Sequence, residues 1–189
     1  MSLPTSHPPS YAMRHPAGTP DAEALYGAVL DEIRAAWPAD AFSASGGVAI
    51  VGIHSGGAWV AQRLAHDLGA VECGVVNVAL HRDDYAKKGL HSKASPTALP
   101  FDVEGRRILL VDDVLYTGRT VRAALNELYD YGRPAAVELA VLADRGGREL
   151  PVAARYVGGF VSADAGATLV LAHGDDGRFT FHVEPRGGA

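Results

Sequence analysis

The sequence has few of the residues that mark secreted, membrane-spanning or zinc-binding proteins. Cysteine occurs once in 189 residues, which excludes an intramolecular disulfide. Because no secretory segment is present either, we expect the cytoplasm to be the compartment. No apolar run approaches the ~18 residues that a membrane helix needs. Cys73, just before an apolar run, is expected to be a small packing residue, and no His/Cys cluster indicates a transition-metal site.

Positive charge is also scarce. The formal net charge is −5, which argues against a generally basic nucleic-acid binder but leaves a local basic patch open. Hydrophobic residues make up 48% of the chain and charged residues 21%, which is typical of a globular protein that buries a sizeable core. The length predicts one domain. Residues 1–20 contain five prolines and no signal-peptide core, so we expect a disordered arm over 1–18 and a single domain over 19–189.

Apolar runs alternate with helical patterns along that domain. Thr19 is predicted to cap a first helix with Pro20 at its first position, and a second helix spans about 57–68. Such alternation predicts an α/β fold with a parallel sheet covered on both faces. Residues 81–100 are polar, show no sustained period and are expected to form a functional or mobile loop. The predicted strands are Gly47–Ile53, Gly74–Leu80, Ile108–Val111 and Ala136–Leu142, followed by a hairpin of Thr168–Ala172 and Phe179–Val183 that extends the sheet or forms a small flap.

The most informative stretch is ILLVDDVLYTGRTV, residues 108–121. A buried strand delivers Asp112 and Asp113 to its carboxyl end, where open α/β sheets place their ligands. Carboxylates at that edge accept hydrogen bonds from ribose hydroxyls. The turn 116–120 then offers backbone N–H groups, two threonine hydroxyls and the start of a helix at about 119, which suit a phosphate dianion. Either half alone is a weak signal, but together they predict a phosphoribosyl site.

This stretch resembles the phosphoribosyl-pyrophosphate (PRPP) signature of type I phosphoribosyltransferases. The flanking sequence is similar to the PyrR family, pyrimidine-operon attenuators that are also uracil phosphoribosyltransferases. The resemblance covers most of residues 21–160 and is densest from 99 to 159. The matching segments are HRDDYAKKG (81–89), LPFDVEGRRILLVDDVLYTGRTVRAAL (99–125), YGRPAAVELAVLADRGGRELPV (131–152) and YVGG (156–159).

The resemblance implies the type I phosphoribosyltransferase fold, with a small C-terminal hood, and assigns roles to residues. Asp112 and Asp113 would hold the ribose hydroxyls and, through them, Mg²⁺. Arg82, in the 81–100 loop, would fold over the pyrophosphate. Arg119 either pairs with phosphate or projects outward. The groups around the phosphate and ribose would be Val114, Leu115, Tyr116, Thr117, Gly118, Arg119 and Thr120.

Two further loops receive roles by family position. Ser55, Gly56 and Gly57 match the pyrophosphate loop, where the family typically has Thr-Arg-Gly. The missing arginine puts the rate of catalysis in doubt. Alternatively, the glycines make only a strand-to-helix turn. Ala143, Asp144 and Arg145 would recognise the base, unless Asp144 and Arg145 simply pair with each other. Uracil as the base follows from the resemblance alone.

Several functions therefore stay open at this stage. The leading one is Mg²⁺-dependent transfer from PRPP to uracil, and a related one uses another base. An RNA-binding attenuator is less favoured, because the helix-1 positions of regulatory members read Tyr26, Gly27 and Leu30 here, and of a later basic set only Arg148 remains. A degenerate protein that binds PRPP without turnover is a further alternative. The family implies a dimer or tetramer.

Overall fold

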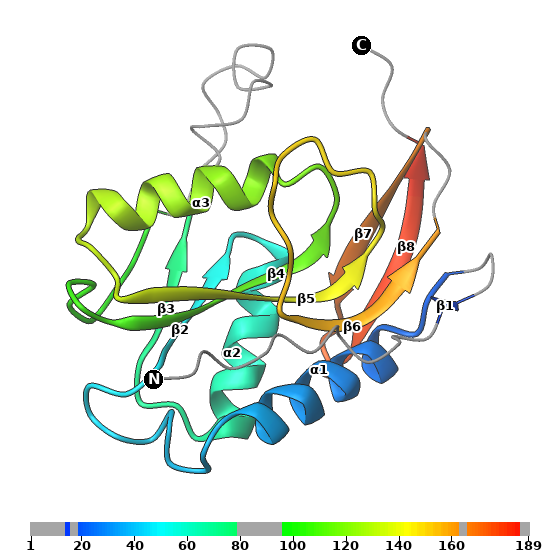
Figure 1. Ribbon diagram of the computed structural model, residues 1–189. Helices are drawn as coiled ribbons and strands as arrows, with labels where there is room; N and C mark the ends of the chain where they lie inside the picture. The colour runs from blue at the N-terminus through cyan, green and yellow to red at the C-terminus, as the bar shows by residue number, and fades with distance from the viewer. Residues whose placement is uncertain (1–13, 16–18, 79–95, 163–165, 186–189) are drawn as a thin grey trace, which may run out of the picture.

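A parallel sheet forms the centre of the molecule in the computed structural model, which describes residues 14–15, 19–78, 96–162 and 166–185 (Figure 1). Its six strands lie in the order β1-β6-β5-β4-β2-β3, and every neighbouring pair is parallel. A second sheet has two antiparallel strands, β7 and β8. The strands are β1 Arg14–His15, β2 Ala49–Ile53, β3 Cys73–Val76, β4 Arg107–Leu115, β5 Ala136–Asp144, β6 Tyr156–Val161, β7 Ala167–His173 and β8 Phe179–Pro185.

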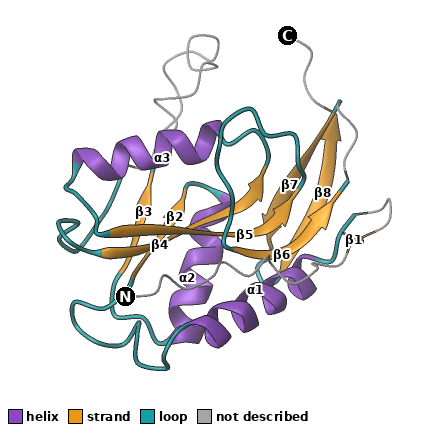
Figure 2. Cartoon of the chain, viewed as in Figure 1, coloured by secondary structure: helices purple, strands orange, loops and turns teal. Residues whose placement is uncertain are grey.

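Three helices cover the two faces of the main sheet, as the α/β pattern predicts. Helices α1 (Ala22–Ala36) and α2 (Gly56–Leu68) lie on one face, and α3 (Arg119–Asp130) lies on the other (Figures 1 and 2). Both faces of the central strands are therefore covered, and all five residues of β2 are buried. Cys73 packs against the α1/α2 core, as expected, and burial raises the pKa of its thiol. No helix in the described ranges has the length and apolar content to cross a bilayer.

The start of α1 differs from the prediction. The helix begins at Ala22, and its N-cap is Asp21 rather than Thr19, because the Asp21 carboxylate accepts the backbone N–H groups of Glu23 and Ala24 at 3.0 and 3.2 Å. Pro20 consequently lies outside the helix. An ionised carboxylate at this end also interacts favourably with the helix dipole, an advantage that a threonine hydroxyl lacks.

Three strands also differ from the sequence reading. Strand β4 does not end at Val111 but continues through the acid pair to Leu115, because β5 pairs with it as far as Asp144. Strand β3 is shorter than predicted and ends at Val76. The short, mixed segment around Tyr156 forms β6, which the sequence reading missed and which pairs with β5. Pairing partners distant in sequence thus set the strand ends.

Strands β7 and β8 form a separate flap, which we call the hood. The hairpin prediction is confirmed, with register from Ala167 opposite Pro185 to His173 opposite Phe179. Its inner face contributes Leu169, Leu171, Phe179 and Phe181 to the core shared with α1 and α2. The predicted arm lies mostly outside the described residues; its Arg14–His15 backbone pairs with Phe160–Val161 of β6.

Candidate active site

A cavity of about 1040 Å³ lies at the carboxyl ends of β2 and β4, beside the start of α3 and against strand β7 of the hood. In parallel α/β sheets this edge is where ligands bind. The predicted residues that line it come from three separate segments. They are Ser55 and Gly56, then Asp112 through Thr120, and then Arg145.

The acid pair lies on the floor of this cavity. Asp112 is 6% exposed and accepts the backbone N–H of Asp113 at 3.0 Å, while Asp113 is only half-buried. The start of α2 packs directly against them. A Cβ at Gly56 would collide with the Asp113 carboxylate, and a Cβ at Gly57 would collide with the backbone of Val111 and Asp112.

These collisions explain two glycines of the Ser55-Gly56-Gly57 loop by packing alone. At Gly56 the collision is with the end of a side chain, so a larger residue there would require the Asp113 carboxylate to move. Ser55 and Gly56 reach the cavity, whereas Gly57 is buried behind its lining. The backbone contact with the acid pair is therefore the structural role of this turn.

The threonine turn closes the other side of the cavity. Gly118 is the N-cap of α3 with φ +89°, and a Cβ there would collide with the Val152 side chain. Glycine is thus required both by the left-handed backbone and by the space available. The Thr117 hydroxyl accepts the Arg119 backbone N–H at 3.3 Å. The first turn of α3 thereby presents hydroxyl groups and the positive end of the helix dipole to the cavity, a favourable environment for a dianion.

Arg119 takes part in an exposed ion pair. Its guanidinium donates to the Glu149 carboxylate, with Nε–Oε2 at 2.8 Å. Both side chains are at least half exposed, so the pair is solvent-screened and contributes little to stability. Arg119 and Glu149 both line the cavity.

Arg148 joins the loop after β5 to the loop after β4. It forms an ion pair with Asp144 and donates to the backbone carbonyls of Tyr116 at 2.7 Å and Val152 at 3.2 Å. The alternative that Asp144 pairs with Arg145 is therefore wrong. Asp144 is 7% exposed, so its charge needs this partner. Arg148 thereby ties the Tyr116 carbonyl, at the start of the threonine turn, to the loop after β5.

Arg145 has a different environment. Its guanidinium lies over the Tyr116 ring, 4.2 Å from the centroid, and donates to the Ala167 carbonyl of the hood at 2.9 Å. It therefore connects the base-side loop to both the threonine turn and β7. Arg145 lines the cavity, whereas Ala143 and Asp144 do not. Of the three residues predicted to recognise the base, only Arg145 therefore faces the cavity.

The predicted residue Arg82 lies outside the described residues. Other residues that line the cavity were not predicted from the sequence. His54 and Asn77 follow β2 and β3 at the same sheet edge, so strand-end position was the available signal. Nothing in the sequence indicated the hood wall, because it depends on how β7 packs. Its lining residues are Thr168, Leu169 and Val170.

The donor set of the cavity fits Mg²⁺ better than a transition metal. No group of three or more His, Cys, Asp or Glu side chains gathers in the part of the chain that the structure describes. Asp112 and Asp113 are hard oxygen donors facing the cavity. Mg²⁺ typically takes one or two carboxylates and completes its shell with water and substrate oxygens. Two carboxylates without a protein cage match this pattern.

Comparison with known proteins agrees with this geometry. The family model described as phosphoribosyl transferase domain matches residues 30–169. Among solved structures, a purine phosphoribosyltransferase from Pyrococcus horikoshii is 24% identical with a TM-score of 0.52 over 75% of this chain and 82% of that protein. A hypoxanthine-guanine phosphoribosyltransferase from Bacillus anthracis is 17% identical with a TM-score of 0.54 over 79% and 87%. The fold is therefore that of the type I phosphoribosyltransferases.

Sequence similarity identifies the family within the phosphoribosyltransferases. The Bifunctional protein PyrR of Ralstonia nicotianae is 60% identical over 169 residues, covering 88% of this chain and 95% of that protein. The protein of the same name from Nitrosococcus oceani is 58% identical over 113 residues, 58% of this chain and 64% of the relative. The chain belongs to the PyrR family of phosphoribosyltransferases.

Proposed function

We propose that this chain transfers the phosphoribosyl group of PRPP to uracil, forming UMP and pyrophosphate. The observation that carries the proposal is that one cavity contains both the Asp112–Asp113 pair and the Thr117–Thr120 turn at the start of α3. Neither feature alone defines a substrate. Together they match the two ends of a ribose 5-phosphate: hydroxyls at one end and a dianion at the other.

The protein's contribution is positioning rather than covalent catalysis. The threonine hydroxyls and N–H groups of the turn hold the 5-phosphate through charge-assisted hydrogen bonds. Asp112 and Asp113 accept hydrogen bonds from the two ribose hydroxyls and hold C1 in line between the incoming base nitrogen and the departing pyrophosphate. Asp112 and Asp113 would also hold Mg²⁺ indirectly, through the ribose hydroxyls, and the cation would supply positive charge to offset that of the departing pyrophosphate. The bond from C1 to the pyrophosphate oxygen breaks as the bond from C1 to the base nitrogen forms; pyrophosphate leaves with the electron pair, and the proton on the base nitrogen passes to the released pyrophosphate or to solvent.

The base end lies between Arg145, with Tyr116 beneath it, and the hood. A pyrimidine needs an apolar wall and a small set of polar partners. Leu169 and Val170 supply the apolar wall, and Arg145 and Thr168 supply polar groups. Uracil is proposed over a purine because the high-identity relatives carry the name PyrR. The purine enzymes match only at 24% identity or less.

A base panel tests the proposal. Purified protein is incubated with PRPP, Mg²⁺ and one of uracil, orotate, guanine or hypoxanthine, and nucleotide and pyrophosphate are quantified. The proposal expects UMP as the main nucleotide. Turnover with another base would refute uracil as the substrate, whereas PRPP binding without turnover would indicate a binding protein.

RNA binding is the second candidate, since the relatives are named bifunctional. Two of the helix-1 positions noted above are buried: Tyr26 is 3% exposed and Leu30 is 8% exposed. Arg148 is committed to Asp144 and to backbone carbonyls. RNA affinity depends on accessible cations, so we expect weak binding. Submicromolar, UMP-dependent filter binding of a pyrimidine-operon leader at moderate salt would overturn this expectation.

The family also leads us to expect a dimer or tetramer, which analytical ultracentrifugation can test.

A further inference from the structure

The hood is held by side chains rather than by strand pairing. Among the described residues, β7 and β8 pair only with each other and not with the six-stranded sheet. Yet Thr168, Leu169 and Val170 of β7 wall the cavity. The position of this wall, and so the shape of the site, depends on whatever fixes the hood to the body of the molecule.

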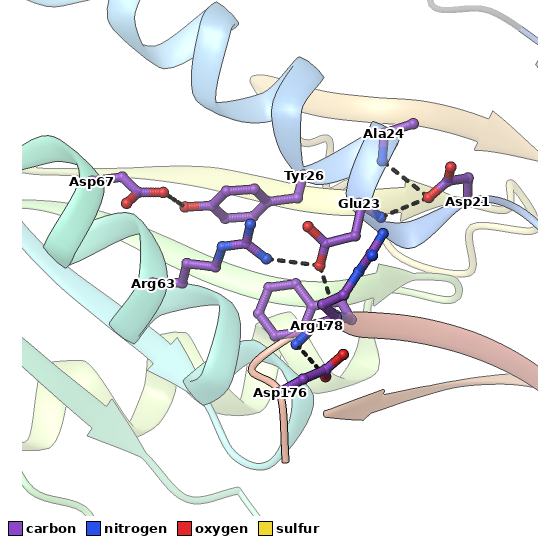
Figure 3. Close-up of polar contacts among 9 residues, drawn as sticks. Asp21, Glu23, Ala24, Tyr26, Arg63, Asp67, Asp176 and Arg178 are labelled. Carbon is purple, nitrogen blue, oxygen red and sulfur yellow. Dashed lines mark hydrogen bonds and ion pairs between the residues drawn. The ribbon is translucent and has the colours of Figure 1, made fainter. Parts of the chain in front are cut away.

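A cluster of side chains between α1, α2 and β8 supplies one such attachment. Arg63 of α2 forms an ion pair with Glu23 of α1 at 2.7 Å, and the same Glu23 oxygen accepts the backbone N–H of Phe179 at 2.7 Å. Figure 3 shows Arg63 extending from α2 toward Glu23 and Tyr26 on α1. One carboxylate oxygen therefore joins α1, α2 and the first residue of β8.

Aromatic rings enclose the same guanidinium. The Arg63 carbon Cζ lies 4.2 Å from the centroid of Tyr26 and 5.1 Å from that of Phe179, and the two rings meet edge to face at 5.8 Å. The Tyr26 hydroxyl donates to Asp67 at 2.6 Å (Figure 3). A planar guanidinium can stack on rings and pair with a carboxylate simultaneously, which lysine does less well. We call Glu23, Tyr26, Arg63 and Phe179 the latch.

Local structure fixes each member of the latch. Asp21 caps the first turn of α1, where Glu23 lies (Figure 3). Helix α2 carries Arg63 and begins at Gly56, against Asp113. The Arg63 hydrogen bond lowers the pKa of Glu23, and burial followed by the Asp67 hydrogen bond raises the pKa of Tyr26. At neutral pH the latch is therefore an ionised pair beside a neutral phenol.

We propose that Arg63 is a positioning residue for the base: through Glu23 and Phe179 it fixes the hood, and the hood wall then sets the affinity for the base. This inference rests on the proposed function for its kinetic part only. Arg63 does not line the cavity. The proposed phosphate end is built by β4 and α3, and among the described residues no hydrogen bond or ion pair joins the latch side chains to either element. A loosened latch should therefore weaken binding of the base and leave binding of PRPP unchanged.

Three variants of the full-length chain test this proposal. Arg63→Met removes the charge and keeps most of the bulk, and Arg63→Lys restores the charge without the planar stack. Arg34→Met is the matched control, because exposed Arg34 donates to the Asp67 carbonyl and makes no described contact with the hood. The readouts are amide hydrogen exchange of peptides covering 167–173 and 179–185, and KM for uracil and PRPP.

We expect Arg63→Met to speed exchange at Phe179 and to raise KM for uracil about tenfold, while KM for PRPP changes less than about twofold. Arg63→Lys should recover part of both effects, and Arg34→Met should match the wild type. Equal rises in both KM values, or faster exchange with unchanged KM for uracil, would overturn the proposal. If the wild type transfers no phosphoribosyl group to uracil, the proposed function fails, and unchanged exchange would then overturn the latch separately.

Discussion

The two ends of the cavity are built in opposite ways. The phosphate end comes from one continuous segment, in which β4, the threonine turn and α3 follow each other between residues 107 and 130. The base end brings together Arg145, the hood strand β7 and, behind it, Glu23 and Arg63 from two helices. The first end is specified locally, whereas the second depends on long-range packing. Substitutions at the two ends should therefore separate PRPP binding from base binding.

The largest effect is expected at the acid pair. Asp113→Asn keeps the shape and removes a charge that we propose serves the ribose hydroxyls and Mg²⁺, so kcat/KM for PRPP should fall by roughly 100-fold or more. Thermal unfolding should stay close to the wild type because Asp113 is only half-buried. Steady-state kinetics and calorimetry of unfolding check both parts. Unchanged kinetics would discredit the assignment of the acid pair.

A substitution at Arg148 tests whether the contact between the loops after β4 and β5 supports both ends of the cavity. Arg148→Met leaves Asp144 with a buried charge that has lost its partner, so the free energy of unfolding should fall by about 3 kcal/mol or more. The carbonyl of Tyr116 also loses its donor. Denaturant unfolding measures the loss. Since both loops lose the same contact, KM should rise for PRPP and for uracil, and a rise for one alone would argue against a shared role.

Gly118→Ala probes the backbone of the turn. The added Cβ meets Val152 at a residue whose φ is +89°, so we expect a loss of about 1–3 kcal/mol in the free energy of unfolding. The double variant Gly118→Ala/Val152→Ala removes the steric part and should recover some stability. A single variant as stable as the wild type would show that the turn tolerates a side chain.

Thr117→Val should have a smaller effect that is specific to the phosphate end. It removes the hydroxyl that accepts the Arg119 N–H and that we propose binds the 5-phosphate, so KM for PRPP should rise about tenfold, equivalent to about 1.4 kcal/mol. KM for uracil should stay unchanged. A larger rise for uracil than for PRPP would reverse the assignment of the two ends.

The smallest expected effect is the pH dependence of the stability that Glu23 provides beside the hood. The hydrogen bond from Arg63 lowers the pKa of Glu23, with further help from Phe179 N–H and nearby Arg178. A carboxyl with a lowered folded-state pKa stabilises the fold above its ordinary pKa and loses that contribution as pH falls through the lowered value. The melting-temperature difference between wild type and Glu23→Gln should thus be largest near pH 7 and shrink below about pH 5. A difference that is constant from pH 7 to pH 3 would contradict this.

The features that could be predicted from the sequence are the local ones, and those that could not be predicted depend on long-range contacts. The turn 116–120 and the helix after it were predictable because Asp112, Thr117 and Gly118 lie in one short segment and each residue type has a local reason to be there. Strand β6 and the end of β4 were not, because pairing with β5 decides them. The partner of Asp144 was missed because both neighbouring arginines were available, and only the loop conformation selects Arg148 over Arg145.

The central claim is that the acid pair and the threonine turn hold one phosphorylated ribose, and a crystal structure of the UMP complex tests it most directly. The account predicts the 5-phosphate at the backbone N–H groups of the turn 117–120, the ribose hydroxyls at Asp112 and Asp113, and uracil beside Arg145 and β7. UMP bound with its phosphate away from the start of α3 would contradict it.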